Sequence, residues 1–257
     1  MIQLLLFNLL LIILIVLVLA IAKKTIKTEK GKNILLLVVA LSTILCHYSS
    51  LLYHGLVDNS AMKFLDENPN LLLPIYPCNL VMWSCLILGL LRNKDSKIGS
   101  FLIDYIFWFG IISSLVGMIV NIDYFNNPTL LDYDVTKGIV AHAIMLLNVL
   151  ALPVFGFVEI KFEKNLFHII CSIILMYVVG LYCNLAIEVI GSYEYAYHVN
   201  SMFIIHSPFE QVTFLKYPII ALIALGCYFI IFTICDMVKF PSSKRWYNRL
   251  FKIKKGE

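Results

Sequence analysis

Seven long runs of apolar residues follow one another along the chain, and short polar connections separate them. Each run has about the twenty residues that an α-helix needs to cross the hydrocarbon core of a bilayer. This pattern predicts an all-α fold, a polytopic membrane bundle of about seven transmembrane helices. The predicted spans are 2–22, 33–55, 71–91, 99–121, 137–158, 165–190 and 215–238.

Composition agrees with a membrane protein. Hydrophobic residues make up 61% of the 257 residues and charged residues only 14%, which leaves too little polar surface for a water-soluble globule. The connections are too short to fold alone, and no internal repeat or low-complexity linker divides the chain. We therefore expect a single transmembrane domain over residues 1–257, whose last part, 241–257, is a basic juxtamembrane tail.

Lys and Arg are sorted between alternate connections. They gather after the first, third and fifth spans and in the tail, whereas the other connections are mainly acidic. By the positive-inside rule, this predicts an outside amino terminus and a cytoplasmic carboxyl terminus. The basic residues between spans on the predicted cytoplasmic side are Lys23, Lys24, Lys27, Lys30, Lys32, Arg92, Lys94, Lys97, Lys161 and Lys164.

The formal net charge of +4 follows from these residues. Lysines beside a membrane face anionic headgroups, so the expected partners are membrane lipids and not nucleic acid. We expect a multi-pass protein of the plasma membrane, specifically a bacterial cytoplasmic membrane. The first run ends Ala20-Ile21-Ala22, as a cleaved signal could, but no basic residue precedes it, so a retained anchor is predicted.

Polar side chains recur at one depth in the outer half of the predicted bundle. His47, Ser50 and His54 lie on one face of the second span, which we expect to look into the bundle. Polar groups in hydrocarbon are costly, so their gathering indicates an interior cavity. A lone membrane histidine more often only bonds a neighbouring helix. The other polar positions in this layer are Cys78, Asn121, His142, Asn184 and Glu188.

Two further patterns have plainer interpretations. Gly110, Ser114 and Gly117 are spaced as one helix face and predict a seam of close helix packing. In the inner half, Asp104, His168 and Asp236 read as isolated polar residues near helix ends.

Two prolines stand just before Cys78. Pro74 and Pro77 lack amide donors, and the ring of Pro77 would clash with the carbonyl of Leu73 inside a helix. The third span is therefore expected to kink or to start irregularly just above Cys78. Irregular backbone at membrane depth is tolerated where it lines a cavity, which places Cys78 at the wall of one.

A cysteine in such a cavity needs a base to become a nucleophile. His142 is the candidate base, and Asn79, Asn121 or Glu188 could orient its imidazole. A Cys/His pair of this kind is the minimum for acyl transfer through a thioester.

The same residues resemble a known family. Residues 73–80, Leu-Pro-Ile-Tyr-Pro-Cys-Asn-Leu, resemble the Leu-Pro-Leu-His-Leu-Cys signature of the YwaF-like bacterial integral membrane proteins. The segment from Ile139 to His142 resembles their later helix with a lone histidine, and Gly191-Ser192-Tyr193 followed by Pro208 resembles their Gly-x-Asn-Tyr loop. In this chain Tyr76 stands where the family has histidine.

That family is similar to a eukaryotic transmembrane acyltransferase that remodels ether phospholipids, and more distantly to membrane hydrolases of fatty-acid esters. The resemblance implies Cys78 as the nucleophile that carries the acyl group and His142 as the general base. The remaining predicted site residues bind substrate: His47, Asn79, Tyr76, Asn121, Asn184 and Glu188.

The leading hypothesis is a membrane-embedded acyltransferase or lipid hydrolase. The alternative is a non-enzymatic transporter or solute-binding component that uses the same cavity. A metal enzyme with His47, His142 and Glu188 is a weaker hypothesis, because no two of them show ligand spacing on one helix. We predict no metal and no cofactor.

Overall fold

The computed structural model describes residues 2–57, 59–119, 129–208 and 212–253. In these ranges the chain is helical, without β-strands. The helices are α1 (Ile2–Thr25), α2 (Glu29–Leu56), α3 (Ala61–Glu67), η1 (Pro69–Leu71), α4 (Pro77–Leu90), α5 (Lys97–Ile119), α6 (Tyr133–Val154), α7 (Phe162–Ile190), α8 (Tyr193–Val199), η3 (Ser201–Phe203), α9 (Tyr217–Lys239), η4 (Ser242–Lys244) and α10 (Trp246–Ile253).

The predicted membrane bundle is confirmed. Six of the described helices, α1, α2, α5, α6, α7 and α9, are long and apolar enough to cross a bilayer. The seventh, α4, has 14 residues, which is about 21 Å of helix and short of a hydrocarbon core of about 30 Å.

The two prolines explain why α4 is short. Pro77 occupies the first turn of α4, where its missing amide costs nothing, and residues 72–76 are not helical. The predicted span over 71–91 therefore begins late, immediately before Cys78. The expectation of an irregular start at this point is confirmed.

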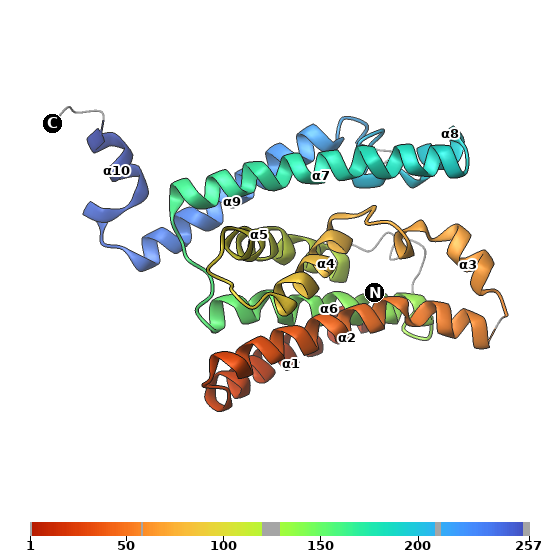
Figure 1. The fold of residues 1–257 in the computed structure, drawn as a ribbon, viewed down its shortest axis with the longest axis horizontal. Helices are drawn as coiled ribbons and strands as arrows, with labels where there is room; N and C mark the ends of the chain where they lie inside the picture. Colours follow the sequence, from red (N-terminus) through yellow and green to blue (C-terminus); the bar gives the residue numbers. More distant parts are fainter. Residues whose placement is uncertain (1, 58, 120–128, 209–211, 254–257) are drawn as a thin grey trace.

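The helices are arranged in three layers (Figure 1). α1, α2 and α6 form one layer, α4 and α5 lie in the middle, and α7 with α9 forms the third. α5 is the central helix: every residue from Leu102 to Gly110 is buried. α1 and α9 instead expose most of their apolar side chains, as helices that face lipid do.

Small residues let the middle layer approach its neighbours. A Cβ at Gly110 would come within 2.6 Å of Val149 on α6 and 3.2 Å of Val81 on α4. A Cβ at Gly89 would come within 2.9 Å of the α2 backbone at Leu37. The predicted close-packing seam on α5 is confirmed.

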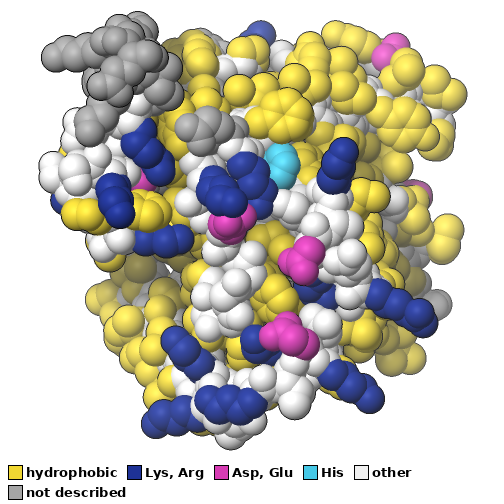
Figure 2. All heavy atoms as spheres, turned by 60° about the vertical axis from the view of Figure 1, so that its left-hand side comes forward, with side chains coloured by type: hydrophobic (Ala, Val, Ile, Leu, Met, Phe, Trp, Pro, Cys, Tyr) yellow, Lys and Arg dark blue, Asp and Glu magenta, His cyan; other side chains and the backbone are white. Residues whose placement is uncertain are grey.

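The two ends of the bundle differ in charge. The basic end holds the connections α1–α2, α4–α5 and α6–α7 and the segment after α9. Figure 2 shows its Lys and Arg side chains gathered on one face, with hydrophobic surface around them. At this end α10 is fixed to α9 and α7, because Asp236 of α9 accepts a hydrogen bond from the Trp246 amide (2.9 Å) and Trp246 stacks on Phe162 of α7.

Candidate functional site

Cys78 is the second residue of α4, directly after Pro77. Asn79, which is buried, accepts a hydrogen bond from the Tyr76 amide through Oδ1 at 3.1 Å and so caps the helix start. The half-buried Cys78 thiol lies within reach of the backbone amides of Cys78 and Asn79. The start of α4 thus places the Cys78 sulfur beside two backbone N–H groups, and a base is still needed to generate the thiolate, the nucleophilic form.

The irregular segment before α4 is held by the loop after α8. The Ile75 carbonyl accepts from the Met202 amide (2.8 Å) and from the Ser201 hydroxyl (3.1 Å). Asn184 of α7 in turn binds Ser201 twice, accepting from its amide (2.8 Å) and donating to its carbonyl (3.4 Å). Asn184 is buried, so its amide group is committed to fixing the backbone beside Cys78.

His142 lies on α6 with a defined tautomer. Its Nδ1 is 2.8 Å from the Gly138 carbonyl oxygen, which can only accept, so Nδ1 carries the proton and Nε2 keeps a free lone pair. The ring packs against α5 at Gly117, where a Cβ would overlap Nε2. An imidazole with an unprotonated Nε2 has the form that a general base requires.

His47 belongs to the same region. Its Nε2 is 3.4 Å from the Asn70 carbonyl oxygen, and it lies within electrostatic range of Lys137 and His142. The structure therefore brings His47 near His142. Cys78 and His142 are not hydrogen-bonded to each other in the part of the chain that is described; α4 and α6 both pack against α5.

The remaining predicted site residues are placed as follows. Tyr76 is the N-cap residue of α4 and stacks on Phe203, and Glu188 is exposed near the end of α7. Asn121 lies outside the described residues. The described His, Cys, Asp and Glu side chains form no cluster of three that could hold a metal ion.

A polar network at the end of α2 was missed by the sequence interpretation. Ser50 donates to Asp134 Oδ1 (2.7 Å), and His54 Nε2 lies 2.8 Å from Asp134 Oδ2, so the network joins α2 to α6. The prediction that His47, Ser50 and His54 face into the bundle is confirmed. Asp134 lies just before the fifth predicted span, and this position could have indicated it as their partner.

The expectation of isolated polar residues in the inner half is wrong. His168 Nδ1 lies 2.6 Å from Asp104 Oδ2, which joins α7 to α5. Asp236 is buried and pairs with the α10 backbone at Trp246 and with Arg249 (3.7 Å). Asp104 and His168 each lie about two turns after the start of their helix, at a similar depth in the bundle. This matched depth is the feature of the sequence that could have indicated the pair.

Comparison with known proteins decides the family. The TMEM164 family matches residues 1–236, nearly the whole chain. The chain belongs to the TMEM164 family. No curated protein and no solved structure matches it. Membership of the TMEM164 family agrees with the six membrane-spanning helices, so the protein is a multi-pass membrane protein in contact with lipid. The YwaF-like resemblance and the bacterial origin stay predictions.

Proposed function

We propose that this TMEM164-family protein is a membrane-embedded acyltransferase or lipid hydrolase, with Cys78 as the nucleophile and His142 as the general base. The observation that carries the proposal is the position of Cys78 at the N-terminus of α4, beside the backbone amides of Cys78 and Asn79. The lone pair on His142 Nε2 supplies a base in the same half of the bundle.

The reaction has two steps. His142 takes the thiol proton, the Cys78 sulfur attacks the carbonyl carbon of an acyl ester, and a carbon–sulfur bond replaces the carbon–oxygen bond. The departing alcohol takes the proton back from His142. In the second step His142 removes a proton from an acceptor hydroxyl or from water, whose oxygen displaces the Cys78 thiolate. An alcohol acceptor gives acyl transfer, and water gives hydrolysis.

Asn79 or His47 is proposed to polarise the ester carbonyl. Asn79 uses its oxygen to cap α4, so its amide nitrogen is the group that would donate to the developing oxyanion. Tyr76 at the start of α4 and Glu188 of α7 are proposed to contact the substrate.

We also propose that the basic end is cytoplasmic, that its Lys and Arg residues meet anionic headgroups, and that the protein lies in the plasma membrane. The sorting of Lys and Arg between the two ends supports this orientation. A reporter fused after Glu257 should be inaccessible from outside intact cells. Labelling of that reporter by an impermeant reagent would overturn the orientation.

Intact-protein mass spectrometry after purification from native lipid tests the chemistry. A covalent acyl adduct that maps to Cys78 and is released by hydroxylamine is the expected result. Cys78→Ala should abolish the adduct, and Cys85→Ala, two turns further along α4, should leave it unchanged as a matched thiol control. His142→Ala should slow both formation and turnover of the adduct.

The opposite result would favour the solute-binding alternative. It would consist of equal lipid profiles in cells that express wild type and Cys78→Ala, with no labile adduct on either protein.

Replacing His142 by cysteine adds a direct geometric check, because a short bifunctional thiol reagent should then crosslink positions 78 and 142. If the folded protein did not form this crosslink, Cys78 and His142 would be too far apart to act as a catalytic pair.

A further inference from the structure

A groove lies on the outside of the bundle between α2 and α4, at the basic end, and has room for about 360 Å³. The α2 residues that line it are spaced at i, i+3, i+4 and i+7, so they form one face of that helix. Because Gly89 packs closely on the α2 backbone at Leu37, the two helices close the groove at its base. The lining residues are Lys30, Asn33, Ile34, Leu37, Gly89 and Arg92.

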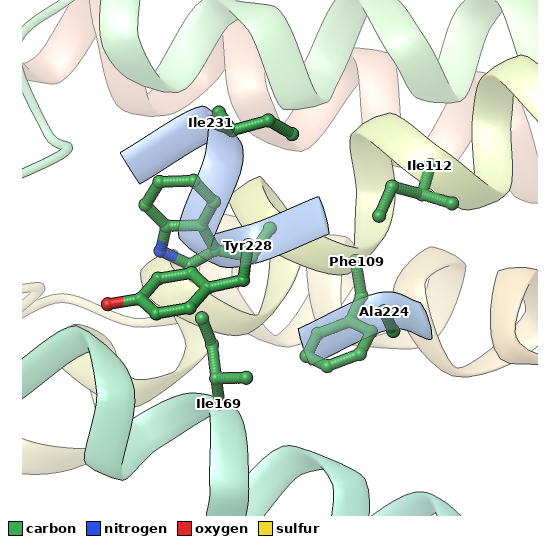
Figure 3. A pocket seen from close by; sticks show the side chains of 7 residues that line it. Phe109, Ile112, Ile169, Ala224, Tyr228 and Ile231 are labelled. Carbon is green, nitrogen blue, oxygen red and sulfur yellow. The ribbon is translucent and has the colours of Figure 1, made fainter. Parts of the chain in front are cut away.

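A second hollow, where α5, α7 and α9 meet, is much smaller. Figure 3 shows Phe109, Ile169 and Tyr228 around it. It has room for about 10 Å³, roughly one water-sized group, and its lining is apolar and aromatic. Of these two spaces, only the groove between α2 and α4 is large enough for the headgroup of a lipid.

Two cationic side chains line this groove without an acidic partner. Lys30 and Arg92 are exposed, and neither forms an ion pair with an Asp or Glu among the described residues. The single acidic residue of α2, Glu29, pairs with Lys32 instead, at 2.6 Å. The groove therefore presents two positive charges that the described part of the chain does not neutralise.

Exposed apolar side chains continue the groove toward the middle of the membrane. On α2 they are Ile34, Val38 and Leu41, and on α4 they are Ile87 and Leu90. Within each helix these residues are spaced as one face, and α2 and α4 pack side by side along this stretch. A hydrocarbon chain that lies beside the groove can therefore contact both helices.

The occupant of such a groove carries negative charge at one end and hydrocarbon at the other. Arg and Lys donate charge-assisted hydrogen bonds to phosphate oxygens, and Arg does so in bidentate geometry. A phosphate monoester carries about −1.5 to −2 charges at pH 7, which matches the two cations. A choline headgroup would bring a further positive charge beside Lys30 and Arg92, and a free phosphate would leave the apolar side chains uncovered.

We propose that the groove binds one anionic phospholipid from the leaflet at the basic end. The phosphate lies between Lys30 and Arg92, and the acyl chains follow Ile34 and Ile87 into the bilayer. This site makes the proposed contact of the basic end with anionic headgroups specific, and it rests on that contact. It does not involve Cys78 or the reaction proposed there.

Native mass spectrometry of the full-length protein in detergent micelles tests the site. The probes are palmitoyl-oleoyl phosphatidate and palmitoyl-oleoyl phosphatidylcholine, which have the same two chains. The wild type should bind phosphatidate at least about tenfold more tightly, as expected for charge-assisted hydrogen bonds. Glycerol phosphate, which has the headgroup without the chains, should not displace phosphatidate when it is added at the same concentration.

Two double variants separate this groove from the general charge of the basic end. Lys30→Gln with Arg92→Gln should weaken phosphatidate binding by about tenfold. Lys24→Gln with Lys97→Gln removes the same charge from exposed positions outside the groove and should leave binding unchanged. All four positions are exposed, so both variants should melt at the wild-type temperature. Cys78→Ala should also bind phosphatidate normally.

The possible failures are distinguishable. An equal loss in the two double variants would overturn the groove site and leave only a general contact between the basic end and anionic headgroups. Equal binding of the two lipids by the wild type would overturn that general contact as well. Displacement by glycerol phosphate would show that the acyl chains take no part, and this too would overturn the lipid site.

Discussion

The imidazole of His142 packs directly on Gly117, so that α5 has no room for a side chain at this position. His142 is thereby held between a backbone hydrogen bond to Gly138 on its own helix and a glycine on the neighbouring one. The orientation of the candidate base depends on a residue that contributes no chemistry itself.

Gly117→Ala should displace His142 and destabilise the bundle. Overpacking of this kind costs about 1–3 kcal/mol, and the loss should be visible as a lower melting temperature in detergent micelles. Gly226→Ala is the control, because a Cβ there meets nothing within 4 Å. Equal melting of Gly117→Ala and wild type would show that the ring is not confined by α5.

Asn184→Ala should loosen the backbone beside Cys78. The variant leaves the buried Ser201 amide and carbonyl without their partner, at about 1–3 kcal/mol for each group. Hydrogen exchange at Ser201 and Met202 should accelerate by at least about tenfold. Glu188→Gln, one turn further along α7 and exposed, should leave exchange unchanged. If exchange at Ser201 and Met202 were as slow in Asn184→Ala as in wild type, Asn184 would not hold this backbone in place.

Asp236→Asn should release α10 from the end of α9. The substitution keeps the volume but removes the charge that pairs with Arg249 and strengthens the bond from the Trp246 amide. Charged hydrogen bonds contribute about 1.5–3 kcal/mol, so trypsin should cut after Lys244 or Arg245 at least about tenfold faster. Asp95→Asn, exposed at the same end, is the control. An unchanged cleavage rate would mean that packing on Phe162 alone holds α10.

Lys94 should make stability depend on pH in the alkaline range. It is 7% exposed between α4 and α5 and donates to the Leu91 carbonyl (3.1 Å). Burial lowers the pKa of Lys94 below its ordinary value of 10.5, which the Glu29 charge partly offsets. The unfolded chain then binds more protons than the folded one, so the free energy of unfolding should rise as pH approaches 10.5.

Lys94→Met should remove this rise, measured by chemical unfolding at several pH values. Lys97→Met, which loses the same charge from an exposed position nearby, should keep it. A rise of the same size in Lys94→Met would assign the pH dependence to other groups.

The sequence by itself determined the helices. A segment that crosses hydrocarbon must be apolar over its whole length and must satisfy its own backbone, so the long apolar helices can be located from hydropathy alone. The prolines at 74 and 77 likewise fixed the start of α4, because their effect on the backbone is local. The separation of charge between the two ends follows from the order of the connections.

Only the tertiary structure decided which polar residues meet. Asp104 and His168 are 64 positions apart, and Ser50 and Asp134 are 84 positions apart. Whether two such residues pair depends on how each helix is rotated and on which helix lies beside it, and hydropathy carries little information on either. Asn184 shows the same limit: its place in a polar stripe suggested a cavity, and the fold uses it to brace the backbone at Ser201.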